Sequence, residues 1–82
     1  MPPDNTPWLH PVKSHRKSLR LTQAELGQRV GVSRQTIVAL ERGDYAPSVF
    51  LALRIARVLG STVEDLFGQA EEAGRQPREG TA

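Results

Sequence analysis

The apolar residues between positions 11 and 68 recur at helical spacing, without the strict alternation of a surface strand. In the segment LTQAELGQRVGVSRQTIVALERG, residues 21–43, two such stretches follow each other with only Gly31 and Val32 between them. Each stretch places its apolar residues on one side of a helix, so the two helices can bury these sides against each other. The positions are Leu26, Gly27 and Val30 in the first stretch, and Ile37 and Leu40 in the second.

Start and stop signals divide the chain into short helices. A Ser or Thr that can cap the first backbone N–H groups precedes four of the apolar stretches, and a Gly that can end a helix follows each. An earlier helix, at about residues 12–19, lacks these signals. The pattern predicts an all-α fold of five short helices. The starts are Thr22, Ser33, Ser48 and Thr62, and the stops are Gly31, Gly43, Gly60 and Gly68.

The two central helices are close enough in sequence to form a helix-turn-helix. This motif joins two helices at a steep angle through a turn of three or four residues that contains a glycine. Gly27 fits this geometry, because a small residue lets the second helix approach the first closely. The alternative is that Gly27 only weakens its helix, by about 1 kcal/mol relative to alanine.

The side of the second helix opposite its apolar residues carries groups that can recognise DNA bases. Arginine can pair with guanine, glutamine with adenine, and a small apolar side chain can contact the thymine methyl group. The alternative is an ordinary solvated helix surface. The residues of this face are Arg34, Gln35, Val38, Ala39 and Arg42.

The net charge of +2 is unevenly distributed. Residues 10–43 contain seven basic and two acidic side chains, a net charge of +5. This half is therefore the candidate anion-binding half, although a solvated charged surface has the same composition. The chain contains no cysteine, which excludes disulfides and thiolate metal ligands. We expect no metal, no cofactor and no membrane span, and a cytoplasmic location.

Both ends of the chain differ in composition from the middle. Residues 1–11 contain four prolines, and residues 69–82 are mainly polar. Such segments bury little apolar surface. We expect a flexible N-terminal arm at 1–11, a DNA-binding domain at 12–68 and a disordered tail at 69–82.

The central segment resembles the Cro and phage-repressor type (XRE-like) helix-turn-helix family. The similarity runs from about residue 12 to 68 and includes LTQAELxQxVGVSRQTIxxLERG, then APS, LALRIARVLG and VEDLF. It implies the short single-domain form of that family, a compact five-helix lambda-repressor-like domain whose recognition helix, about 33–42, enters the major groove of DNA.

The resemblance also implies roles for individual residues. Gln23, at the start of the first helix of the motif, is expected to bind a phosphate, and Arg16 is expected to form a structural ion pair with Glu41. The base-contacting residues are then Arg34, Gln35, Thr36, Val38 and Ala39, and the further phosphate-contacting residues are Ser33, Arg42, Arg20 and Tyr45.

Three positions depart from the family pattern. His15 replaces a leucine that the family has in its first helix. We interpret His15 as a partly buried structural histidine because no second metal ligand is placed near it. Arg20 replaces a glycine, so a positive φ there costs strain while the side chain gains a phosphate contact. Asp44 repels phosphate, which leaves the contact of this loop to Arg42 and Tyr45.

The fourth helix has more apolar residues than one core face requires. Nine of the twelve residues from Ser48 to Leu59 are apolar. We expect one set to form the core and the other a two-fold dimer interface; a monomer with this helix at its centre is the alternative. The expected core set is Val49, Leu53, Ala56 and Leu59, and the expected interface set is Phe50, Leu51, Ile55, Val58 and Phe67.

These observations predict a sequence-specific regulator of transcription that binds double-stranded DNA. Without an effector module, a small domain acts most simply as a repressor that occludes DNA, and a homodimer would bind a near-palindromic operator with half-sites about 10 base pairs apart. An enzyme is not expected, because the chain has no thiol, no glycine-rich phosphate loop and no catalytic carboxylate pair. The remaining alternative is an antitoxin-like or co-regulatory module whose tail, 69–82, binds a protein partner.

Overall fold

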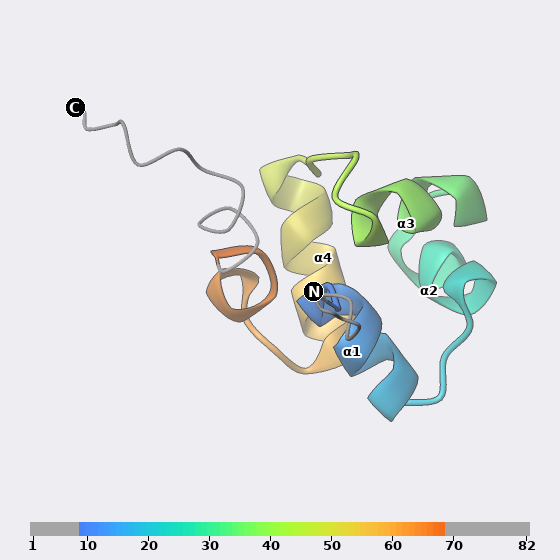
Figure 1. Cartoon of the computed structure of the whole chain (residues 1–82), viewed down its shortest axis with the longest axis horizontal. Coiled ribbons are helices and arrows are strands. Elements are labelled where there is room, and N and C mark those ends of the chain that lie inside the picture. The colour runs from blue at the N-terminus through green and yellow to red at the C-terminus, as the bar shows by residue number, and fades with distance from the viewer. Residues whose placement is uncertain (1–8, 69–82) are drawn as a thin grey trace, which may run out of the picture.

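The computed structural model of the chain describes residues 9–68, which form helices around one core (Figure 1). Within these residues there is no strand, so the all-α prediction is confirmed. None of the described helices is both long and apolar enough to cross a lipid bilayer. Residues 1–8 of the arm expected at 1–11, and the tail expected at 69–82, lie outside the described residues. The elements are α1 (Pro11–Ser18), α2 (Gln23–Val30), α3 (Arg34–Glu41), α4 (Val49–Leu59) and the π-helical turn η2 (Glu64–Gly68).

The predicted capping residues do begin their helices. Thr22 Oγ1 accepts a hydrogen bond from the Glu25 backbone N–H at 3.0 Å, and the Glu25 carboxylate accepts one from the Thr22 N–H at 2.8 Å. These bonds form the capping box of α2, and they lower the pKa of Glu25. Ser33 and Ser48 cap α3 and α4 through the same type of bond. Helix boundaries therefore follow from local chemistry that the sequence displays.

The stop signals were right for three helices. Gly31 and Gly60 end α2 and α4 in the left-handed conformation, with φ of 82° and 67°. Gly43, with φ of 82°, directly follows Arg42, the C-cap of α3, and the Asp44 N–H donates to the Ala39 carbonyl oxygen at 2.9 Å. Gly68 was wrong as a stop, because it belongs to η2 and has no positive φ.

The first helix begins with an unusual cap. His10 Nδ1 accepts a hydrogen bond from the Val12 backbone N–H at 3.1 Å, and Pro11 occupies the first helical position, where its missing N–H removes no helical bond. His10 is buried. The prediction that the flexible arm extends to residue 11 is therefore wrong for His10 and Pro11, which belong to the folded part.

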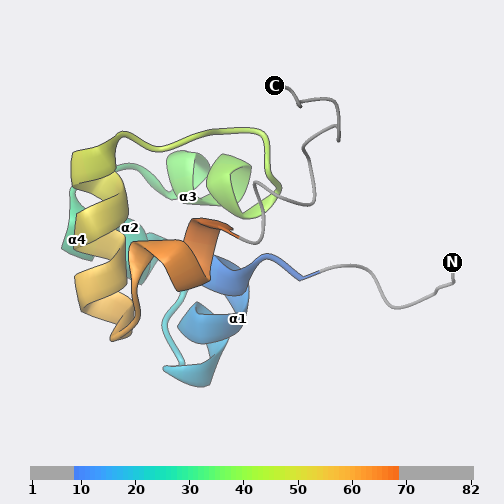
Figure 2. The ribbon, with the colours of Figure 1, turned by 90° about the vertical axis from the view of Figure 1, so that its left-hand side faces the viewer.

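The helices surround a single apolar core. α2 packs against α3 and α4, whereas α1 packs against η2, α3 and α4. Figure 2 shows η2 lying across the space between α4 and α1, where it closes the core on the side away from the α2–α3 pair. The side chains that are almost completely buried are Val12, Leu26, Val30, Ile37, Leu40, Ile55 and Leu66.

The orientation of α4 corrects two predictions. Val49 and Leu53, expected in the core, are 71% and 40% exposed. Leu51 and Ile55, expected in a dimer interface, are 3% and 0% exposed, because they fill the core of their own chain. Their assignment to the interface is therefore wrong.

The other three residues of the expected interface differ in exposure. Phe50 is 74% exposed. Val58 and Phe67 are partly buried and pack against the core, and the Phe67 ring lies edge-on to His10 at 5.9 Å between centroids. Of the five residues expected in the interface, only Phe50 is therefore freely available to a second subunit.

Candidate DNA interface

The turn between α2 and α3 is fixed by close backbone packing. The Val32 N–H donates to the Gly27 carbonyl oxygen at 2.9 Å, and a Cβ atom on Gly27 would lie 2.7 Å from the Val32 carbonyl oxygen. Real Cβ atoms do not approach that closely. Glycine at this position therefore permits the close approach of the turn, and the view that Gly27 only weakens its helix is wrong.

The turn presents one face of α3 to solvent. Ile37 and Leu40 are buried, whereas Arg34 and Gln35 are exposed at the first turn of the helix. The next turn of this face, Val38 and Ala39, is partly buried. An exposed N-terminal turn on a short helix has the geometry of a recognition helix that enters a major groove with its first residues.

Ser33 and Thr36 interact at the start of α3. The Thr36 N–H donates to Ser33 Oγ at 3.1 Å, and the two hydroxyl oxygens are 3.1 Å apart. Because each hydroxyl has a partner within the helix, these side chains are held in place before any ligand binds. A hydroxyl that accepts the cap bond can still donate its proton to a phosphate oxygen.

A buried ion pair joins α1 to the end of α3. Arg16 Nε donates to Glu41 Oε2 at 2.7 Å and Arg16 Nη2 donates to Glu41 Oε1 at 3.1 Å, with side-chain exposures of 8% and 2%. Arg16 Nη1 also donates to the Leu21 carbonyl oxygen at 2.7 Å. Arg16 thus fixes the turn between α1 and α2 to the C-terminal end of α3.

Gln23 belongs to the same network. Its Nε2 donates to Glu41 Oε1 at 3.1 Å, so one amide proton is used within the protein. The side chain is only partly buried, and the amide group has a second proton. Glu41 therefore fixes the orientation of an amide group that can still donate to an outside acceptor.

The loop after α3 contains an exposed ion pair between Arg42 and Asp44. Arg42 Nε lies 3.7 Å from Asp44 Oδ2, with side-chain exposures of 71% and 65%. Tyr45 is 43% exposed. Arg42 remains accessible to a phosphate, but Asp44 is the group that a phosphate would displace.

Arg20 has a strained backbone. Its φ of 60° is the only positive value at a non-glycine residue within 9–68. The left-handed region costs roughly 1–2 kcal/mol for a residue with a Cβ atom. The side chain is exposed and lies three residues before Gln23.

Two positioning residues were missed in the sequence. Arg54, in the apolar run of α4, donates through Nε to the Val30 carbonyl oxygen at 3.1 Å and so fixes α4 to the end of α2. His10 caps α1, and burial lowers its pKa, an effect that the negative charge of Glu41 partly opposes. An arginine within an apolar run and a histidine before a proline were the available signals.

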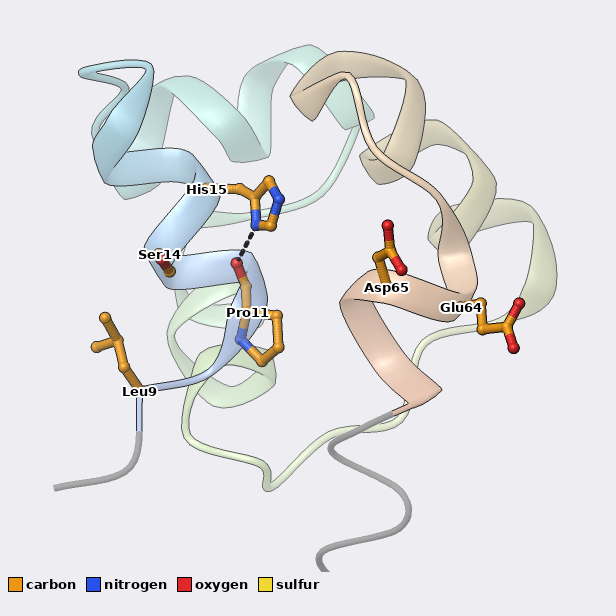
Figure 3. A pocket seen from close by; sticks show the side chains of 6 residues that line it. All are labelled: Leu9, Pro11, Ser14, His15, Glu64 and Asp65. Atoms are coloured by element: carbon orange, nitrogen blue, oxygen red, sulfur yellow. Dashed lines mark hydrogen bonds between the residues drawn. The ribbon is translucent and has the colours of Figure 1, made fainter.

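His15 lies outside the motif, in an open depression of about 460 Å³ between α1 and η2 (Figure 3). Its Nδ1 lies 2.9 Å from the Pro11 carbonyl oxygen. Glu64 and Asp65 line the opposite side of the depression. Nowhere in residues 9–68 do three His, Cys, Asp or Glu side chains gather in a way that could bind a metal ion.

Comparison with known proteins agrees with this geometry. The helix-turn-helix family HTH_3 matches residues 12–66. An uncharacterised HTH-type transcriptional regulator of Methanothermobacter thermautotrophicus is 55% identical over 65 residues, which cover 78% of this chain and 94% of the relative. The HTH-type transcriptional regulator YgzD of Bacillus subtilis is 46% identical over 61 residues, 74% of this chain and 92% of the relative. The immunity repressor protein of Bacillus phage phi105 is 33% identical over 58 residues, 71% of this chain and 40% of the relative.

Proposed function

The chain belongs to the HTH_3 helix-turn-helix family and is a DNA-binding regulator of transcription, not an enzyme, and from this premise we propose that it is a homodimeric repressor of a near-palindromic operator. The observation that carries the proposal is the exposure of Arg34 and Gln35 on a helix whose opposite side is buried. Free arginine and glutamine side chains at the first turn of α3 can pair with guanine and adenine in the major groove.

Base contacts come from the exposed face of α3 in this proposal, and phosphate contacts come from its surroundings. Because Gln23 and Ser33 are held by hydrogen bonds within the protein, they bind phosphates with little loss of conformational entropy. Arg20, Arg42 and Tyr45 are exposed and add contacts on either side. Thr36, Val38 and Ala39 complete the base-contacting face.

Selection of bound sequences from a random pool of duplex DNA tests the specificity. We expect two half-sites related by a two-fold axis, about 10 base pairs apart. Arg34→Ala should reduce the preference at one base position by about 1–3 kcal/mol, whereas Gln23→Ala should weaken binding to all sequences equally. Equal losses on every sequence for both variants would contradict the assigned roles.

In this proposal the dimer forms through an apolar surface on α4. Val49, Phe50 and Leu53 are exposed together on the first turns of this helix, and we name them the α4 patch. Three large apolar side chains gathered on a small domain favour contact with another apolar surface. Light scattering should detect a dimer free or bound to DNA at micromolar concentration, and a monomer under both conditions would refute the homodimer.

Repression is the simplest outcome for a domain of this size, since a protein bound over a promoter excludes polymerase. The phage phi105 relative, an immunity repressor by name, supports this direction. A reporter gene placed behind the selected operator should lose expression when the protein is present. Increased expression would show that the chain is an activator.

A further inference from the structure

Two cations of the first helix, Lys13 and Lys17, have no role in the interface proposed above, and they lie near Arg20, which has one. Lys13 and Lys17 are four residues apart in α1, which places them on one face of the helix, and Arg20 follows two residues after the helix ends. Lys17 and Arg20 are exposed and Lys13 is partly buried. Within residues 9–68 none of the three forms an ion pair. We name these residues the basic stripe.

Helix stability does not explain the basic stripe. Like charges three or four residues apart repel each other, and α1 contains no acidic residue to offset them. A cation near a helix C-terminus is favourable, which accounts for Lys17, but Lys13 lies in the first turn, where the helix dipole disfavours it. Arg20 occupies a strained backbone position that glycine would adopt freely. Two of the three cations therefore cost the fold stability.

The basic stripe borders the residues proposed to bind phosphate. Arg16 lies on the neighbouring face of α1, and its guanidinium contacts both Glu41 and the Leu21 carbonyl oxygen. Glu41 in turn binds the amide of Gln23. On a helix of 3.6 residues per turn, Lys13 and Lys17 fall on the side of Arg16 away from His15, whose ring lies beside η2 (Figure 3). The stripe and Gln23 are thus on adjoining surfaces.

We propose that the basic stripe binds the DNA backbone next to the Gln23 phosphate, outside the base pairs that α3 contacts. The inference rests on the proposed function and extends its interface from the motif to α1. Lys13 and Lys17 are about 6 Å apart along the helix axis, so each can reach a different phosphate. A polyanion also relieves the repulsion among the three cations, which a neutral partner would leave in place.

Matched substitutions test the proposal. Lys17→Gln and Arg57→Gln each remove one exposed cation from the last turn of a helix, so both lose the same interaction with the helix dipole. On the selected operator a dimer loses one cation at each half-site, so the slope of log affinity against log salt concentration should fall by about 1.8 for Lys17→Gln and stay unchanged for Arg57→Gln. Lys13→Gln should also lower the slope by about 1.8, and the double lysine variant by about 3.6.

Phosphate ethylation adds a positional measurement. Ethyl groups on the phosphates beyond the half-site should weaken binding of the natural chain but not of the double lysine variant. Identical salt slopes for Lys17→Gln and Arg57→Gln would overturn the proposal, provided that urea unfolding shows both variants folded. In that case Gln23→Ala and Arg34→Ala still report on the motif, so the proposed function stands. If the natural chain prefers no duplex sequence, the proposed function and this inference both fail.

Discussion

His10 is a helix cap whose ring can gain a proton, and burial lowers its pKa. Its Nδ1 accepts the Val12 N–H, which only the unprotonated nitrogen can do. Burial is the main cause that lowers the pKa of His10, and Glu41 opposes it. The unfolded chain therefore binds a proton near the ordinary value of 6.5, while the folded chain binds it only at lower pH. The stability that neutral His10 contributes is complete above pH 6.5. It is lost as the pH falls from 6.5 toward the lower pKa of the folded chain.

We expect the urea midpoint of the natural chain to fall between pH 7 and 5. His10→Asn retains a capping acceptor but no titrating group, so its midpoint should depend less on pH in this range, even if the lost contact with Phe67 lowers stability throughout. Parallel midpoint curves for the two proteins would contradict the assignment to His10.

At Arg20, one substitution should change the stability of the fold and its affinity for DNA in opposite directions. Arg20→Gly should raise the free energy of unfolding by roughly 1 kcal/mol, because glycine adopts a positive φ without strain. The same change should weaken DNA binding, since it removes a cation beside Gln23. Arg20→Ala is the control, because it loses the charge and keeps the strain. Chemical denaturation and DNA titration of both variants measure the two effects, and a stabilised glycine variant with full affinity would exclude a phosphate contact.

Single residues were predictable where their role is local. The side chain of Thr22 caps the residue three positions later, and the sequence alone shows both members of that bond. His10 was missed because histidine is not among the common cap residues, although its bond to the Val12 N–H is local. Arg54 was missed because its partner, the Val30 carbonyl oxygen, lies 24 residues earlier and is brought near by folding. Patterns of neighbouring residues contain no information about such long-range contacts.

At the level of elements, the angle between α2 and α3 depends on Gly27. Gly27→Ala would gain about 1 kcal/mol of helix propensity if the site had room. The added Cβ atom would instead meet the Val32 carbonyl oxygen at 2.7 Å, so the turn must shift. We expect a net loss of about 1–3 kcal/mol, as for other overpacked sites.

DNA affinity distinguishes a shifted motif from a merely weaker helix. Gln28→Gly, on the exposed side of α2, removes about 1 kcal/mol of helix propensity without touching the turn. Gly27→Ala should lose more affinity for the operator than Gln28→Gly does, measured at a temperature where both are folded. Equal affinities would show that the turn tolerates the extra atom.

The ends of three helices depend on Glu41. Glu41→Gln should lower the free energy of unfolding by about 3–5 kcal/mol, because the guanidinium of Arg16 would stay buried without its counter-charge. Denaturant titration measures this loss. Arg16→Met combined with Glu41→Leu removes both charges, and we expect this pair to recover most of the stability. If Glu41→Gln alone were as stable as the natural chain, the ion pair would have no structural role.

Helix positions were easier to predict than helix orientation. Caps and glycines mark where α2, α3 and α4 begin and end, because these signals are local. The inward side of α4 was wrongly assigned, since nine apolar residues in twelve are compatible with more than one orientation. Arg54 and Arg57 were the better guide: both are exposed, and they lie on the side that carries Phe50 and Leu53.

For the whole molecule, the exposed face of α3 was predictable, and the packing that surrounds it was not. The basic half of the chain and the exposed residues of α3 could be identified from charge and spacing alone. That Gln23 and Arg16 meet at one carboxylate depends on the packing of α1 against α3, which the sequence implied only through family resemblance. Where a second subunit binds depends on which apolar residues remain after the core is filled.

A substitution in the α4 patch should dissociate the proposed homodimer without unfolding its subunits. Phe50 is 74% exposed, so Phe50→Lys removes little packing within its own subunit but places a charge in the proposed contact. We expect a monomer with an unchanged urea midpoint and an affinity for the two-half-site operator lowered by about 100-fold or more, as the second half-site no longer adds to binding.

Leu51→Lys, at the adjacent position, is the control for Phe50→Lys. Leu51 is 3% exposed, so a lysine there should unfold the domain itself, and its circular dichroism should be lost along with the dimer. The contrast between adjacent positions separates an interface residue from a core residue. A Phe50→Lys protein that remains dimeric by light scattering would place the subunit contact elsewhere, and the apolar residues at the start of α4 would then require another explanation.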